Sequence, residues 1–260
     1  MDLFLQILAL LCAAIAVLYR RQAPPSPKLR NGRILLVVLA VLFWGASLIL
    51  ESSLKKGEAI LWQMAIERES KTLGLVSASA IQKDLGVSGK VLVIVPKHEP
   101  DNERYLSSLQ QGMSSLLGEK VKFISPESAR VQASGKGATW SDFKACAAKA
   151  SGYDAIVFFI SPPFSDTLEA DHDQITELKQ ALGKNCHLIF TRPYAIPMGG
   201  PIEDGSISLL ILPNSQKKKS LAKNFQEASV EQDDFIVISA ANIDQIQAQN
   251  PQLSLLDKRP

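Results

Sequence analysis

Polar side chains follow the apolar runs in the second half of the chain, where they could bind or transform a ligand. They combine ammonium, imidazole, carboxylate, hydroxyl, guanidinium and phenol groups. If the runs are parallel strands, these side chains meet at one edge of a sheet, where open α/β sheets bind ligands. A site for a small anionic or hydroxylated ligand would then contain Lys97, His98, Glu99, Ser161, Asp166, Thr191, Arg192 and Tyr194. The more common case is that such residues are ordinary loop and helix-cap residues.

Specific catalytic motifs are missing from the sequence. No G-x-G-x-x-G follows Val95, and no G-x-S-x-G elbow occurs. Lys136 is followed by glycine instead of serine or threonine, and Arg130 stands where a P-loop needs its first glycine. His98 and Asp166 could orient Ser161 for hydrolysis, but nothing in the sequence fixes that geometry. We therefore assign no catalytic residue and favour a non-enzymatic protein.

One segment has the composition of a metal-binding cluster. It contains Glu169, Asp171, His172 and Asp173. These residues fall in the first turns of an expected helix, where each carboxylate is stabilised by about 0.3–1 kcal/mol through the helix dipole. We therefore predict neither a metal site nor a cofactor.

Two cysteines lie in the part of the chain that reads as soluble. Cys146 falls in the helix before the third strand, and Cys186 directly precedes the fourth, so both approach the amino edge of neighbouring strands. In an exported domain they could form a disulfide if their Cα atoms lie within about 7 Å. Two buried free thiols are the alternative, which we favour.

Buried strands alternate with amphipathic helices from Lys90 onward. Runs of consecutive apolar, often β-branched residues are typical of strands covered on both faces of a parallel sheet. Such runs occur at Val91–Val95, Val121–Ile124, Ala155–Ile160, His187–Phe190, Ile207–Leu212 and Phe235–Ser239. We predict an α/β fold: a doubly wound, mostly parallel, flavodoxin-like sheet of about six strands in the order 2-1-3-4-5. The Thr191–Gly205 link leaves an antiparallel fifth strand open.

Helix signals fall between these strands. Asp101 can cap a helix over Glu103–Leu117, and Gly118 suits its C-terminal end. Thr139 and Asp142 have the spacing of a capping box. A further helix is expected over residues 218–228. The ends of the last two strands add Asn214, Ser215, Ser239 and Asn242 to the polar edge.

Two apolar runs near the N-terminus, 3–19 and 34–50, predict a transmembrane helical hairpin. The second run has no charged residue, and a helix of its length just crosses the roughly 30 Å hydrocarbon core if its flanks help. Loop 20–33 carries five basic side chains and no acid, which indicates a cytoplasmic loop. A signal peptide is disfavoured because Asp2 is the only charge before the first run. We expect a bacterial inner-membrane protein with a periplasmic C-terminal domain.

The predicted organisation has four parts. A hairpin over 1–54 precedes a juxtamembrane helical linker over 55–89, a soluble α/β domain over 90–250 and a tail over 251–260. Residues 51–260 contain 23 basic and 25 acidic side chains, so the basic character of the chain comes from its N-terminal loop. A nucleic-acid-binding surface is therefore not expected.

Five segments within residues 90–194 carry a resemblance. KVLVIVP is followed by GMSSLLG and KVKFISP, and then come YDAIVFFISPPFSD and LKQALGKNCHLIFTRPY. Together they resemble one lobe of the sugar-binding periplasmic proteins and their repressor relatives. The resemblance implies a hinged second lobe that closes over the ligand. Because few residues follow Tyr194, we expect a single lobe that docks a partner and not a clamp-type sugar site.

Three functions follow from these features. The first is a membrane-anchored, non-enzymatic accessory or assembly subunit whose external domain docks a partner protein or a second copy of itself. The second is a tethered solute-binding or sensing domain that uses the carboxyl edge of the sheet. The third is a membrane-bound hydrolase or transferase. In each case the bilayer is a partner through residues 3–19 and 34–50.

Overall fold

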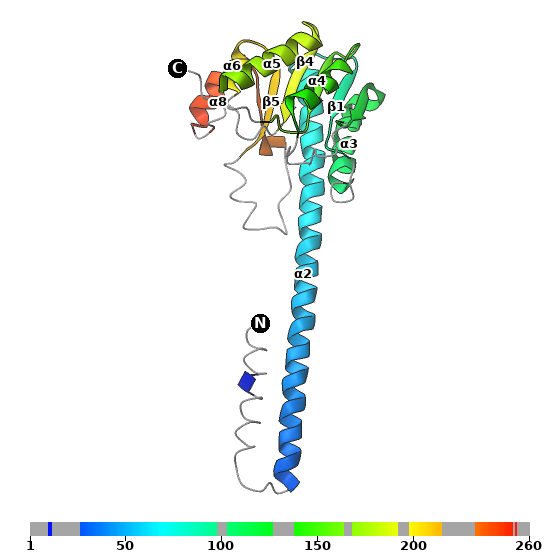
Figure 1. Cartoon of the computed structure of the whole chain (residues 1–260), viewed down its shortest axis with the longest axis vertical. Coiled ribbons are helices and arrows are strands. Elements are labelled where there is room, and N and C mark those ends of the chain that lie inside the picture. Colours follow the sequence, from blue (N-terminus) through cyan, green and yellow to red (C-terminus); the bar gives the residue numbers. More distant parts are fainter. Residues whose placement is uncertain are drawn as a thin grey trace. The chain divides into compact units, whose positions relative to one another are not determined.

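The chain forms two compact units, Met1–Gln63 and Met64–Pro260. Helix α2, Pro27–Lys83, begins in the first unit and ends in the second (Figure 1). The computed structural model describes residues 10–11, 27–97, 103–126, 138–163, 168–191, 198–214, 232–251 and 253.

Within the first unit, α2 contains the uncharged run 34–50. Arg33 precedes this run and Glu51 follows it, and both belong to the same continuous helix. Val41, Leu42 and Trp44 of this run are 61–65% exposed. In the part of the chain that the structure describes, no helix is both long enough and apolar enough to cross a membrane. The predicted transmembrane hairpin is therefore not supported, and its first run, 3–19, lies outside the described residues except for two leucines.

The second unit is built on a six-stranded sheet. The strand order is β2-β1-β3-β4-β5-β6, and all neighbouring strands are parallel except β5 and β6. The predicted α/β class and mostly parallel sheet are confirmed. The fifth strand is parallel to the fourth, and the sixth is the antiparallel one. The strands are β1 Val91–Ile94, β2 Val121–Ile124, β3 Ala155–Phe158, β4 His187–Thr191, β5 Leu209–Pro213 and β6 Phe235–Ile238.

The first face of the sheet is covered by the C-terminal part of α2 and by α3, Glu103–Leu117. Successive strand residues point to opposite faces, so Val91 and Val93 of β1 point to this side. The second half of the predicted linker, 55–89, thus contributes core side chains to the second unit. The buried helix residues on this face include Leu73, Val76 and Ile81 of α2 and Leu109 and Met113 of α3.

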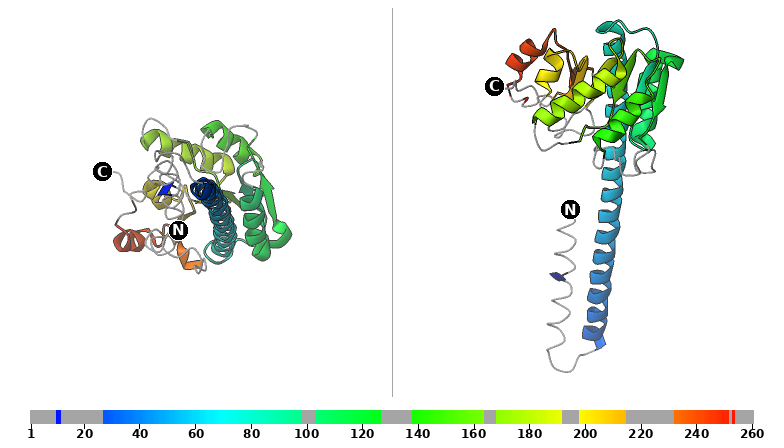
Figure 2. Two further views of the ribbon diagram at one scale, coloured as in Figure 1. Left: turned by 90° about the horizontal axis from the view of Figure 1, so that it is seen from below. Right: turned by 45° about the horizontal axis from the view of Figure 1, so that its top comes forward.

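Among the described residues, four helices cover the second face. Helices α4 and α5 lie side by side over it (Figure 2). The predicted capping box opens α4, because the Thr139 side chain accepts from the Asp142 N–H and the Asp142 carboxylate accepts from the Thr139 N–H. The predicted helix over 218–228 lies outside the described residues. The four helices are α4 Trp140–Ala148, α5 Leu168–Leu182, α6 Gly199–Glu203 and α8 Ile243–Gln249.

Candidate functional site

The chain leaves the carboxyl ends of β1 and β3 in opposite directions. After β1 it enters α3 on the first face, whereas after β3 it enters α5 on the second face. The two strands are parallel neighbours in the sheet. Such a reversal opens a crevice beyond the strand ends, which is where ligands bind in open α/β sheets.

Lys97 and Ser161 follow β1 and β3 by the same number of residues. Ile94 pairs with Phe158 in the register of the two strands, and the Phe159 N–H donates to the Ile94 carbonyl at 2.8 Å, so the pairing continues past the strand ends. Lys97 and Ser161 each come three residues after the last paired residue. Lys97 is exposed and Ser161 is 8% exposed. Two of the predicted site residues thus follow adjacent parallel strands at one edge of the sheet.

Thr191 lies inside the sheet. It is the last residue of β4 and is 1% exposed, and its Oγ1 donates to the Phe158 carbonyl at 3.1 Å. A buried hydroxyl needs such a partner, because leaving it unpaired costs about 1–3 kcal/mol. This hydrogen bond of Thr191 therefore joins β4 to β3.

The other predicted residues divide into two groups. Ser239 and Asn242 follow β6, which is antiparallel to β5, so they lie at the amino edge of the parallel strands. The prediction that they lie at the carboxyl edge is therefore wrong. Asn242 accepts from the Ser239 N–H at 2.7 Å and begins α8. The remaining predicted residues, outside the described ones, are His98, Glu99, Asp166, Arg192, Tyr194 and Ser215.

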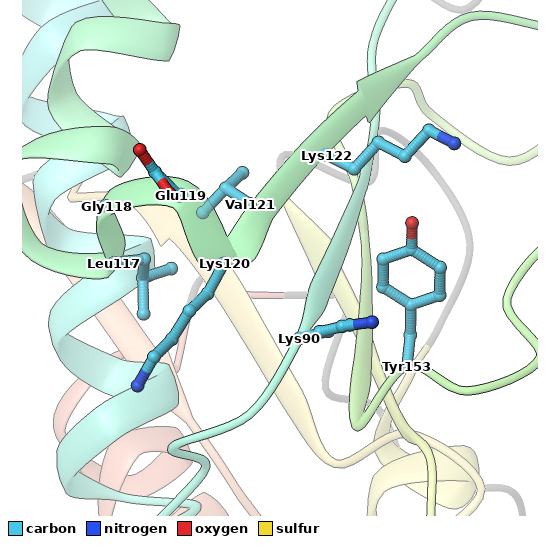
Figure 3. Close-up of a pocket in the computed structure, with 8 residues that line it drawn as sticks. All are labelled: Lys90, Leu117, Gly118, Glu119, Lys120, Val121, Lys122 and Tyr153. Carbon is cyan, nitrogen blue, oxygen red and sulfur yellow. The ribbon is translucent and has the colours of Figure 1, made fainter.

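The described residues also form a pocket at the amino edge of the sheet, which the sequence analysis missed (Figure 3). Its volume is about 790 Å³. The only signal for it in the sequence is the recurrence of lysine beside the first two strands. Its lining residues are Lys90, Leu117, Gly118, Glu119, Lys120, Val121, Lys122 and Tyr153.

Cys186 belongs to a polar group at the same edge, near the starts of β3 and β4. The Lys179 ammonium donates to its carbonyl at 2.6 Å, and His187 Nδ1 lies 3.1 Å from the Ser208 hydroxyl. Burial has the largest effect and raises the pKa of the Cys186 thiol. The charge of Lys179 lowers this pKa, and the charge of Asp154 raises it. Cys186 is therefore kept as a thiol, whereas a nucleophile must be a thiolate.

Cys146 and Cys186 are both free thiols in the structure. They are 2% and 4% exposed and belong to the core of the second face. Buried thiols in apolar surroundings pack as small hydrophobic side chains.

His172 contacts a carboxylate from another element. Its Nε2 lies 2.6 Å from Asp204 Oδ2, which joins α5 to the end of α6. Among the described residues, no group of three or more histidine, cysteine or acidic side chains is arranged to hold a metal ion. The contact between His172 and Asp204 is a hydrogen bond between two helices.

No protein-family model matches the sequence, and no curated protein matches it either. Solved structures do match the fold. A glucose-galactose binding protein from Geobacillus stearothermophilus is 12% identical, with a TM-score of 0.43, over 66% of this chain and 61% of that one. An arabinose binding protein from the same organism is 13% identical, with a TM-score of 0.45, over 68% and 62%.

A periplasmic ribose ABC transporter structure from Conexibacter woesei is 10% identical, with a TM-score of 0.48, over 72% of this chain and 63% of that one. The predicted resemblance to sugar-binding periplasmic proteins is therefore confirmed. The chain spans about three-fifths of the length of these structures. At these identities and scores the resemblance carries no argument about what the chain binds.

Proposed function

We propose that the second unit is a ligand-binding domain that takes a small hydroxylated or anionic solute at the crevice between β1 and β3. The observation that supports it most is the level placement of Lys97 and Ser161 beyond two adjacent parallel strands. An ammonium group attracts an anion or donates to a hydroxyl oxygen, and a serine hydroxyl both donates and accepts. Further proposed contacts follow β1, β3 and the adjacent parallel strand β4 at the same edge of the sheet; they are His98, Glu99, Asp166, Arg192 and Tyr194.

We further propose that a membrane holds this domain through residues 3–19 and 34–50. Support comes from the uncharged run in α2, whose described side chains include exposed Val41, Leu42 and Trp44. Exposed apolar side chains in such numbers mark a surface that contacts lipid or protein. The basic loop 20–33 favours an extracytoplasmic position for the domain. Extraction with alkaline carbonate should leave the protein in the membrane fraction, and release would contradict the anchor.

Ligand-dependent stabilisation tests the binding function. Full-length protein in mild detergent is heated with a panel of monosaccharides, amino acids and dicarboxylates. A true ligand at a hundredfold excess over its Kd stabilises the folded state by about 2.7 kcal/mol. Lys97→Gln and Ser161→Ala should weaken the effect, whereas Lys184→Gln, at an exposed lysine in the loop before β4, should not.

Two results would count against solute binding. One is a panel without any stabilising compound, and the other is equal binding by the Lys97→Gln and Lys184→Gln variants. Docking of a partner protein, as an accessory or assembly subunit, stays a prediction. Co-purification of a stoichiometric partner with the full-length protein would favour it over solute binding.

A further inference from the structure

The pocket at the amino edge lies at the opposite end of the strands from the proposed crevice. Lys90 directly precedes β1, Lys122 is the second residue of β2, and Tyr153 comes shortly before β3. Gly118 ends α3 with a φ of +60°, in the left-handed region that glycine adopts without strain. This turn leads through the 3-10 helix Gly118–Lys120 into β2 and forms one wall of the pocket.

Lys90 and Lys122 project to the same face of the sheet. Lys90 comes two residues before Leu92, and Lys122 two residues before Ile124, and both Leu92 and Ile124 pack on the second face. Tyr153 packs against that same core. Leu92 pairs with Lys122, so the two lysines are one strand and two residues apart, about 8 Å across the face. Their long side chains can therefore reach one bound group.

The charges in the pocket are not balanced from within. Lys120 uses its ammonium to donate to the Ser88 carbonyl at 2.6 Å. In Figure 3, Lys120 and Glu119 point to the other side of the strands from Lys90, Lys122 and Tyr153. Within the described part of the chain, no partner is found for the ammonium of Lys90, the ammonium of Lys122 or the hydroxyl of Tyr153.

Asp154, the acid that follows Tyr153, accepts the backbone N–H of Lys90 at 2.7 Å. Gly89 makes room for this contact, because a Cβ there would lie 1.8 Å from Asp154 Oδ2. Among the described residues, no ion pair is found between this carboxylate and an ammonium group of the pocket. Like charges on neighbouring strand positions repel each other, and a bound anion would lower the repulsion between Lys90 and Lys122.

Protection of the sheet edge explains only part of this pattern. β2 is an edge strand, and lysines on edge strands prevent pairing with other chains. Lys90 precedes β1, which lies between two strands, so edge protection gives no reason for a lysine there.

We propose that this pocket binds a phosphate group, as free phosphate or as the phosphate of a small ester. The ammonium groups of Lys90 and Lys122 donate to the phosphate oxygens, and the Tyr153 hydroxyl donates a further hydrogen bond. Lysine is a common phosphate ligand in proteins, where it acts as a compact positive charge. Leu117 and Val121 also line the pocket, but both pack against the first face, on the other side of the strands from the two lysines.

Isothermal titration of the full-length protein in uncharged detergent tests this site. Inorganic phosphate and glycerol 1-phosphate are titrated at constant ionic strength. We expect saturable binding whose Kd rises at least tenfold in the Lys90→Gln/Lys122→Gln double variant and about threefold to tenfold in Tyr153→Phe. Lys71→Gln, at an exposed lysine on α2, should leave the Kd unchanged. Circular dichroism verifies that each variant folds. If the double variant does not fold, the single variant Lys122→Gln, at an exposed residue, tests the site instead.

Absence of saturable phosphate binding would overturn the proposal, and so would equal weakening by Lys71→Gln. Short-chain phosphatidic acid identifies the source of the phosphate. A Kd more than tenfold below that of glycerol 1-phosphate indicates a lipid headgroup, whereas equal values indicate a soluble phosphate. Phosphate binding that is lost in Lys97→Gln but kept in the Lys90→Gln/Lys122→Gln double variant would place the anion at the carboxyl-edge crevice and would overturn this proposal, which separates the two tests.

Discussion

The two faces of the sheet are closed by different kinds of contact. On the first face, α2 and α3 approach through glycines: a Cβ on Gly112 would lie 2.2 Å from the Lys71 carbonyl oxygen, and one on Gly74 would lie 2.6 Å from that of Leu109. On the second face, three aromatic rings pack against one another. Between ring centroids, Phe158 lies 4.6 Å from Phe143 and 5.3 Å from Phe190, and Phe143 and Phe190 lie 6.1 Å apart.

This difference determines which changes each face tolerates. A contact made by two backbones has no flexible atom that can yield, so the first face should be sensitive to added volume. A contact made by stacked rings depends on filling space, so the second face should be sensitive to lost volume. The two functional proposals depend on this layering, because the crevice and the phosphate pocket lie at the two edges of the same sheet.

The largest effect is expected for Phe158→Ala on the second face. Phe158 is fully buried, and its loss leaves a cavity between two other rings. Such truncations cost about 3–5 kcal/mol of unfolding free energy. Denaturant unfolding of the full-length protein in detergent measures the change. Phe158→Leu serves as the matched control and should cost less than half as much, and equal costs would mean that ring volume is not what closes this face.

The next effect concerns added volume on the first face. Gly112→Ala places its Cβ against the Lys71 carbonyl oxygen and the Leu75 nitrogen, so the helices must separate. Overpacking of this kind costs about 1–3 kcal/mol. Gly57→Ala in α2 is the control, because no atom lies within 4 Å of its added Cβ. A Gly112→Ala variant as stable as Gly57→Ala would remove the distinction between the faces.

Much of the fold follows from local patterns in the sequence. VLVIV and AIVFFI predict strands buried on both sides, and Thr139 with Asp142 predicts the start of α4. The direction of β6 does not follow from such patterns, because an apolar run reads the same for parallel and antiparallel pairing. The core role of Leu73 and Ile81 does not follow from such patterns either, because residues 55–89 read as a linker that precedes the α/β domain.

The candidate sites could be predicted only where strand order determines them. Lys97 and Ser161 follow from the rule that parallel strands end at a common edge. Thr191 also lies at this edge, but its hydroxyl donates to the Phe158 carbonyl. The two residues are far apart in the sequence, so their spacing does not predict this contact. The lysine pocket needs the register of β1 with β2, which sequence alone does not give.

A smaller, pH-dependent effect is expected at Asp204 on the second face. Burial raises the pKa of this carboxyl group, but hydrogen bonds from Ser206 and His172 and the charge of His172 outweigh burial and lower it below 3.8. A lowered carboxyl pKa adds stability above the unfolded value, and this is lost as the pH falls through the folded value. Asp204→Asn should therefore cost about 1 kcal/mol near neutral pH and nothing well below pH 3.8.

Unfolding free energies measured between about pH 2 and pH 7 test this effect. Asp173→Asn is the matched control, because Asp173 is an exposed acid on α5, the helix that carries His172. A cost of Asp204→Asn that does not change with pH would show that packing and not charge is lost.

The smallest effects are expected at the surface, for two exposed ion pairs that join neighbouring helices, one chosen from each face. Arg104 Nη1 lies 3.2 Å from Glu67 Oε1 across α3 and α2, and Lys144 pairs with Glu177 across α4 and α5. All four side chains are 38–63% exposed, so water screens both pairs regardless of the packing below. Double-mutant cycles with glutamine replacements should give about 0.2–1 kcal/mol for each pair. Both coupling energies should fall with added salt. Strong coupling on one face alone would show that the difference between the faces extends from the buried layer to the surface.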